Sequence, residues 1–190
     1  MRPAAAVPIQ RCMPLGGIAR RLAVLSLAVA ALTAAPAFAS PRSPAESLSP
    51  LEHNVLADIN AFRAQHDLAK LRLNVRLTAA ARAHTRQMAR DGYFAHSSAD
   101  GSSFWRRIQR FYTSAPWRYW SVGENLLWQS PDVDAAGALQ MWMNSPPHRE
   151  NLLTARWREV GISAVHVAAA PGTYDGLDVT IVTADFGVRH

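Results

Sequence analysis

The order of the predicted elements in this 190-residue chain indicates an α+β fold in which helices cover an antiparallel sheet. Four helical segments are expected before a final pair of β-patterned segments, over residues 160–167 and 178–188. Proline, glycine and aspartate between them, over residues 171–176, are typical of a hairpin connection. A third strand is expected over residues 122–128. The chain shows no internal repeat and no second domain.

The first two helices are predicted from capping residues and from apolar residues at helical spacing. Ser49 as N-cap with Glu52 three residues later forms a capping box, and apolar residues then recur through Phe62. The second helix is expected over residues 75–90, and Gly92 is placed to end it. Both helices should present one apolar stripe to the sheet.

The third and fourth helices are shorter. Residues 103–112 read as an amphipathic helix, with Phe104, Ile108 and Phe111 facing the core and Arg106, Arg107 and Arg110 facing solvent. The fourth helix is expected to start with Ser130, Pro131, Asp132 and Asp134, which places acids at its positive end. Trp142 belongs to its buried row, Pro146 ends it, and His148 follows on a short turn.

Residues 1–39 are expected to be a cleaved signal peptide. Four arginines precede an apolar run over residues 22–35, which is too short for an ordinary membrane span. Ala37-Phe38-Ala39 is a small-x-small cleavage signal before Ser40. The sequence therefore predicts a secreted protein, extracellular or associated with the cell envelope, with a flexible lead-in over residues 40–48 and one domain over residues 49–190.

Removing this leader changes what the charge implies. The formal charge is +6 for the whole chain, and the leader holds four arginines and no acids, so the remainder carries +2. Such a value gives no reason to expect a nucleic-acid partner. The only cysteine, Cys12, lies in the leader, so the domain must fold without disulfides. No stable membrane span is expected once the leader is removed.

Three polar side chains stand in surroundings that suggest chemistry. His96 follows the apolar pair Tyr93-Phe94, Glu124 interrupts an apolar strand, and His148 follows the prolines after the fourth helix. Two imidazoles and a carboxylate suit Zn²⁺ or another divalent ion, and they can also act as acid, base and orienting partner without a metal. No local spacing motif joins them, so three unrelated surface or capping groups are the competing interpretation.

Several ordered motifs carry a family resemblance. They cover residues 94–101, 123–126 and 142–153. Together these motifs resemble the CAP superfamily of cysteine-rich secretory proteins, venom antigens and plant pathogenesis-related proteins. The match is closest to the bacterial, cysteine-poor branch of secreted single-domain SCP-like members, and it covers residues 51–188.

The resemblance implies a three-layer α-β-α sandwich with a central antiparallel sheet. It also implies a cleft with two histidines and two glutamates, of which His96, Glu124 and His148 match three and Ser145 replaces the fourth. Some members bind a divalent metal through the histidines. A zinc site formed by His96 and His148, with Glu124, is therefore expected here as an inference from the family.

Other residues have two interpretations each. Ser145 is either a nucleophile beside the histidine or the N-cap of a short turn, and Ser97 is a weaker nucleophile candidate. His84, on the inner stripe of the second helix, is either a hydrogen-bonded core histidine or a support behind His96. Glu150 either points into solvent or replaces the missing carboxylate.

Two functions compete at this level. The first is a secreted binding module for a divalent metal, a lipid or sterol, or an envelope polymer. The second is a metal-assisted hydrolase using Glu124 and the two histidines. The family resemblance favours the first, because the family has no single established activity. An arginine–aromatic segment over residues 105–120 is either an amphipathic helix with a packed loop or a second ligand surface.

Overall fold

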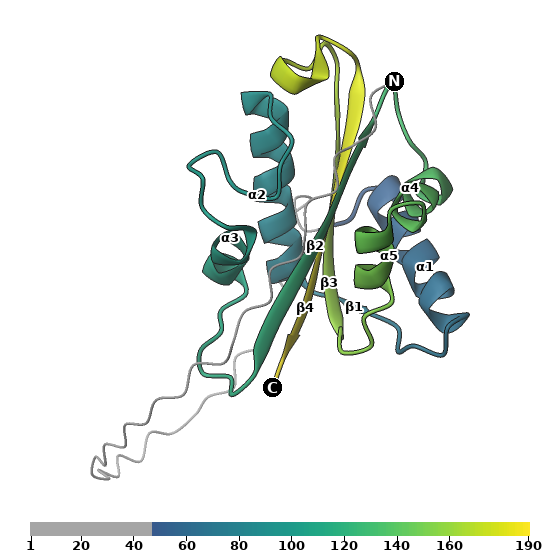
Figure 1. Cartoon of the computed structure of the whole chain (residues 1–190), viewed down its shortest axis with the longest axis vertical. Helices are drawn as coiled ribbons and strands as arrows, with labels where there is room; N and C mark the ends of the chain where they lie inside the picture. The colour runs from purple at the N-terminus through teal and green to yellow at the C-terminus, as the bar shows by residue number, and fades with distance from the viewer. Residues whose placement is uncertain (1–46) are drawn as a thin grey trace, which may run out of the picture.

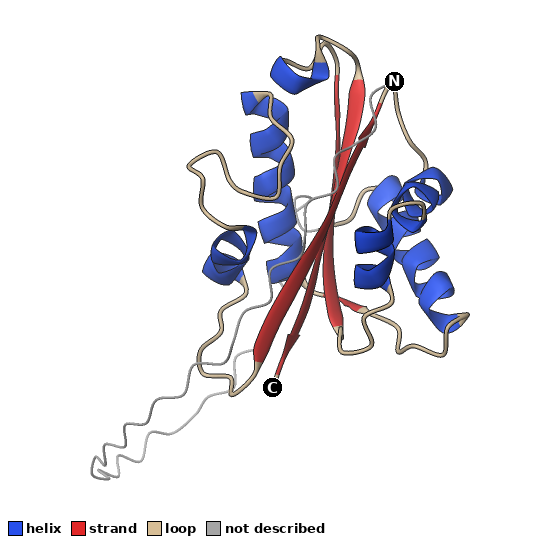
Figure 2. Ribbon diagram, in the orientation of Figure 1, coloured by secondary structure: helices blue, strands red, loops and turns tan. Residues whose placement is uncertain are grey.

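The two longest strands of this protein are buried along most of their length, so the sheet needs a helical layer on each face. These strands are β2 (Trp120–Gln129) and β4 (Val179–Arg189). The computed structural model describes residues 47–190 and has three layers, with the sheet in the middle (Figures 1 and 2). The predicted three-layer α-β-α sandwich is confirmed. The predicted signal peptide and residues 40–46 of the lead-in lie outside the described residues.

The sheet has four strands in the order β1-β3-β4-β2. The long strands β3 (Glu159–Val167), β4 and β2 pair antiparallel, as predicted. The sequence missed β1 (Arg72–Leu73), which runs parallel to β3. A strand of two residues has no alternating pattern to detect, and only its pairing with β3 defines it. Because β2 is an edge strand of the sheet, the two helical layers can approach each other beside it.

One layer contains α2 (Val75–Asp91) and α3 (Phe104–Phe111), and the other contains α1 (Pro50–Ala64), α4 (Ala135–Met143) and α5 (Pro146–Leu152) (Figure 1). The first four helices confirm the predicted ones to within a few residues. The segment that holds His148 was predicted to be only a short turn, but it is the helix α5. The two prolines after α4 occupy the first positions of this new helix, where proline is tolerated.

The predicted capping box of α1 is present and also joins the helix to the sheet. Ser49 Oγ accepts from the backbone N–H of Glu52 at 3.2 Å, and Glu52 Oε2 accepts from the backbone N–H of Ser49 at 2.7 Å. The second oxygen, Oε1, accepts from the backbone N–H of Ala164 on β3 at 3.0 Å. Glu52 therefore caps α1 and fixes its beginning against the sheet.

Buried Arg63 ties the end of α1 to the end of α5. Its Nη1 donates to the carbonyls of Leu152 at 2.7 Å and Thr154 at 3.1 Å, and its Nε donates to that of Ala69 at 2.9 Å. The guanidinium is fully buried, so these carbonyls replace the water that would otherwise surround it. The layer that carries His148 is thereby held together.

Within residues 47–190, no helix has the length and apolar character needed to cross a bilayer.

Helix α2 lies directly on β3 at Gly161. A Cβ at this glycine would overlap the backbone of Leu77 and Thr78 in the first turns of α2. The other end of α2 stops at Gly92, whose φ of 68° places it in the left-handed region, as the sequence predicted. Helix and strand can therefore approach this closely only if residue 161 has no side chain.

Gly161→Ala should destabilise the fold by about 3 kcal/mol or more, because the obstacle is helix backbone and not a mobile side chain. Urea denaturation of the variant and of the parent protein measures the difference. Ala83→Gly, at an exposed position of the same helix, is the control and should cost about 1 kcal/mol. If the two variants were equally stable, Gly161 would not limit the approach of α2 to the sheet.

Candidate functional site

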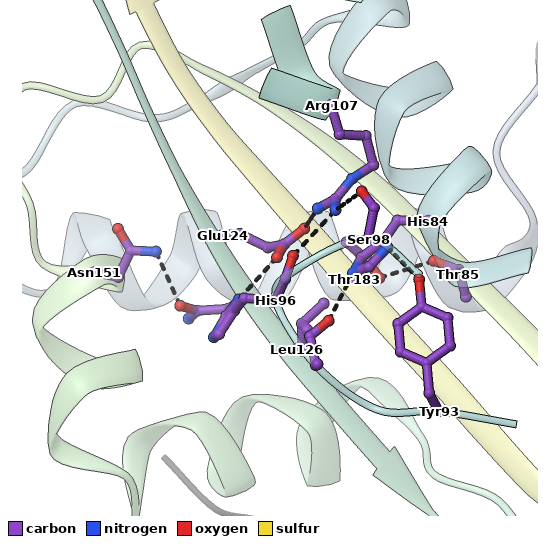
Figure 3. A network of polar contacts seen from close by, with 12 residues as sticks. His84, Thr85, Tyr93, His96, Ser98, Arg107, Glu124, Leu126, Asn151 and Thr183 are labelled. Carbon is purple, nitrogen blue, oxygen red and sulfur yellow. Dashed lines mark hydrogen bonds and ion pairs between the residues drawn. The ribbon is translucent and has the colours of Figure 1, made fainter. Parts of the chain in front are cut away.

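The candidate site is organised around a buried carboxylate. Glu124 lies on β2, and its side chain is fully buried. Its Oε1 accepts a hydrogen bond from His96 Nδ1 at 2.8 Å, and its Oε2 is paired with Arg107 Nη2 (Figure 3). Both oxygens therefore have a partner, and neither faces solvent.

The prediction that Arg107 faces solvent together with Arg106 and Arg110 is wrong. Arg107 is only 5% exposed. Besides pairing with Glu124, its Nη1 donates to the carbonyl of His96 at 3.1 Å and to Ser98 Oγ at 3.3 Å. The amphipathic pattern of α3 counted every arginine as polar, but Arg107 lies next to the inward-facing Ile108. The buried Glu124 requires a cation, and this arginine supplies it.

The charges around Glu124 keep it ionised. Burial alone would raise the pKa of its carboxyl, but the positive charge of Arg107 and the hydrogen bond from His96 lower the pKa to about 2. Because a carboxylate only accepts hydrogen bonds, His96 Nδ1 must carry a proton. The other ring nitrogen, Nε2, is thus the one that points away from the acid.

A second carboxyl, Asp185, was missed by the sequence analysis. It lies on β4 directly opposite Glu124 and is fully buried. Burial and the negative charge of Glu124 raise the pKa of Asp185 well above its usual value, which favours its neutral form. The signal was available: Asp185 interrupts an apolar strand in the same way as Glu124. The ionised Glu124 therefore favours the neutral form of the carboxyl that lies opposite it on β4.

His84 supports the site from behind. Its Nε2 donates to the carbonyl of Ala95 at 2.9 Å, next to His96 in the chain, and its Nδ1 lies 3.5 Å from the hydroxyl of Tyr93. Burial lowers the pKa of His84 to about 4, so the ring is neutral at physiological pH. His84 is thus a buried, hydrogen-bonded histidine, and its bond to Ala95 reaches the residue before His96.

His148 approaches the site from the opposite helical layer. Its ring centroid lies 6.5 Å from that of His96, beside the terminal strand β2. Asn125 donates to the backbone carbonyl of His148 at 3.1 Å, and Asn151 donates to Asn125 Oδ1 at 2.9 Å. These two hydrogen bonds hold the backbone of α5 at His148 against β2. Burial, and then the neighbouring His96, lower the pKa of His148 to about 4. The two histidines and Glu124 thus lie close together, although they come from three separate elements.

The remaining candidates lie further out. Ser145 is at the N-cap position of α5, but its hydroxyl makes no capping hydrogen bond. Glu150 is exposed on α5. Among residues 47–190, no group of three or more histidine, cysteine, aspartate or glutamate side chains is arranged to hold a metal ion. Both oxygens of Glu124 are already engaged, so the two imidazoles are the donors that remain.

Comparison with known families identifies the family of this chain. The model of the CAP family, described as the cysteine-rich secretory protein family, matches residues 56–186. The chain belongs to the CAP family. His96, Glu124 and His148 all lie within the matched range.

Two proteins of Bacillus subtilis have similar sequences. The chain is 30% identical over 119 residues to the uncharacterized protein YkwD of Bacillus subtilis, covering 63% of this chain and 44% of that protein. It is 29% identical over 111 residues to the uncharacterized membrane protein YlbC of the same organism, covering 58% of this chain and 30% of that protein. The chain therefore spans less than half the length of these curated relatives.

Solved structures share the CAP fold. An extracellular protein containing an SCP domain from Bacillus anthracis has a TM-score of 0.55 and 26% identity, with 74% of this chain and 44% of that one covered. An outer surface protein of Borrelia burgdorferi has a TM-score of 0.56 and 19% identity, with 75% of this chain and 97% of that one covered. At that lower identity the likeness supports the fold alone.

Arg107→Met should destabilise the protein by about 3–5 kcal/mol, because it leaves the charge of Glu124 buried without its cation. Arg106→Met, at the exposed neighbouring position, should change stability by no more than about 0.5 kcal/mol. Chemical denaturation of both variants gives the comparison. Similar losses would mean that the pairing of Arg107 with Glu124 does not hold this region together.

Proposed function

We propose that this CAP-family chain is a secreted binding domain, and that the imidazoles of His96 and His148 bind a divalent cation such as Zn²⁺. The main support is the state of Glu124, whose two oxygens are engaged by His96 and Arg107. This carboxylate orients an imidazole and does not face a substrate. Secretion is inferred from the leader predicted over residues 1–39 and agrees with the extracellular SCP-domain protein of Bacillus anthracis that has a similar fold.

The donor set fits an imidazole-rich cation site. Histidines that bind metals commonly donate their second ring N–H to a carboxylate, which fixes the ring and its tautomer. His96 has this arrangement, with Nδ1 on Glu124 and Nε2 directed away. His148 stays neutral at physiological pH, which is the form that binds a metal. His96 and His148 would hold the ion, with Glu124 as the orienting group and not a direct ligand.

The hydrolase alternative is less well supported by the same contacts. A general base must reach the proton it removes, and its pKa should lie near the working pH. Glu124 is fully buried, and its pKa of about 2 makes it a weak base. Water activated at this site would therefore have to be deprotonated by another group. Binding without turnover is the simpler function for this arrangement.

Zinc should stabilise the folded protein through the two histidines. At about 100 times its dissociation constant, the gain is roughly 2.7 kcal/mol, or about 5–10 °C in melting temperature for a domain of this size. Differential scanning fluorimetry with and without zinc measures the shift. His96→Ala and His148→Ala should each lose most of it.

His166→Ala is the matched control, because His166 is exposed on β3 and lies outside the site. This variant should keep the full zinc shift. If His148→Ala responded to zinc as strongly as the parent protein, the imidazole pair would not be the binding site.

The binding proposal also predicts no catalysis. Peptides, esters and cell-wall fragments incubated with the zinc-loaded protein should be hydrolysed no faster than in buffer with zinc alone. Hydrolysis that disappears in a folded Glu124→Gln variant and persists in His166→Ala would instead establish the metal-assisted hydrolase. Circular dichroism verifies the fold of each variant before the assay.

A further inference from the structure

Arginines from distant parts of the chain meet at one end of the sheet. Strand pairing causes this convergence: Arg72 at the start of β1 lies opposite Glu159 at the start of β3, and Arg189 at the end of β4 lies opposite Trp120 at the start of β2. Arg156 and Arg158 immediately precede β3. This is the end where β4 finishes, at the bottom of Figure 1. Neither the candidate site nor its imidazoles involve these residues.

These side chains line a groove of about 600 Å³, which we call the arginine groove. Its only acidic side chain is Glu159, which already accepts hydrogen bonds from Tyr112 Oη at 2.6 Å and Asn74 Nδ2 at 3.0 Å. Arg72 Nη2 also lies 3.8 Å from Glu159 Oε1, so this one acid serves one of the four arginines, and the other three have no acidic partner among the described residues. The groove is lined by Arg72, Arg156, Arg158 and Arg189, with Trp117 and Tyr119 among its other residues.

Aromatic rings hold two of these guanidinium groups in place. The Arg189 guanidinium lies 4.0 Å from the ring centroid of Tyr112 and 5.1 Å from that of Trp117. The Arg156 guanidinium lies 4.8 Å from the ring of Trp157. Stacking uses the flat face of a guanidinium and leaves its in-plane N–H groups for other partners; one of them, on Arg189 Nη1, donates to the carbonyl of Thr113 at 3.2 Å. Outward N–H donors in a plane suit the oxygens of phosphate groups.

Acidic residues gather at the opposite end of the sheet. Asp132 follows the end of β2, and Asp175 and Asp178 lie between β3 and β4. The register pairs Gln129 with Thr180 and Val167 with Val179 there, so these connections share one end. The small net charge therefore conceals a strong separation of charge along the sheet. An anionic surface would attract the arginine end and repel the other.

Exposed apolar side chains lie in and beside the arginine groove: Trp117 lines it, whereas Leu73 and Val75 line a neighbouring groove along α2 that also contains arginines. Of the four large apolar residues exposed in residues 47–190, three belong to segments at or next to this end. They are Leu73 in β1, Val75 at the start of α2 and Trp117 just before β2, and Trp117 is 44% exposed. A free anion gains nothing from aliphatic neighbours. Arginines mixed with exposed tryptophan and aliphatic residues are typical of surfaces that enter a lipid headgroup layer.

We propose that the arginine end of the sheet is a docking surface for a bilayer rich in anionic phospholipid. The guanidinium groups would contact lipid phosphates, while Trp117 would lie at the headgroup level. This orientation would direct the acidic end away from the membrane. The proposal does not depend on metal binding by His96 and His148, and either can fail alone.

Vesicle co-sedimentation tests this proposal, using phosphatidylcholine vesicles with and without phosphatidylglycerol. The full chain is used throughout, so any contribution of its N-terminal apolar run is common to all variants and is measured on the neutral vesicles. Binding should require phosphatidylglycerol and weaken as salt is raised. Arg72→Gln with Arg156→Gln should lower the affinity for anionic vesicles by about 25-fold, at about fivefold for each basic residue removed.

The matched control removes two exposed arginines outside the groove, through Arg90→Gln with Arg149→Gln. It changes the net charge equally and should leave vesicle binding within about twofold of the parent. Equal losses in the two double variants, or equal binding to neutral vesicles, would overturn the proposal. So would release by inorganic phosphate beyond that by chloride at the same ionic strength, because it would identify the groove as a site for a free anion.

Discussion

The ionised carboxylate of Glu124 is the constraint on which this part of the molecule depends. A charge that is removed from water requires a partner, and Arg107 provides it from α3. The same guanidinium also holds the carbonyl of His96 and the hydroxyl of Ser98. One buried ion pair therefore determines where α3 lies on the sheet and how the segment before it runs. The orientation of the His96 ring follows from that arrangement.

The sequence predicted the frame of the fold well because its signals were local. Capping at Ser49, the stop at Gly92 and the apolar character of β2 and β4 depend on near neighbours in the chain. The residue types suggested a shared site of His96, Glu124 and His148, but at such long separations they carry no spacing information, and the family resemblance supplied most of that expectation. The structure brings them close together beside the edge strand β2.

The errors have a common physical cause. Arg107 and Asp185 are buried polar groups, and patterns that divide residues into apolar and polar place such groups on the surface. Asp185 lies on a strand that is buried on both faces, so no alternation reveals its environment. Its state depends on Glu124, a residue 61 positions earlier in the chain. Charges that compensate each other across such distances become visible only when the strands are paired.

His96 follows α2 and His148 lies on α5, so their rings, whose centroids are 6.5 Å apart, come from opposite helical layers. Apart from these rings, the two helical layers are connected mainly through the strands of the sheet between them. A cation bound by both rings would link the two helical layers directly to each other. Occupancy would then be felt as mechanical stiffness across the whole thickness of the domain, including at positions that never touch the bound species.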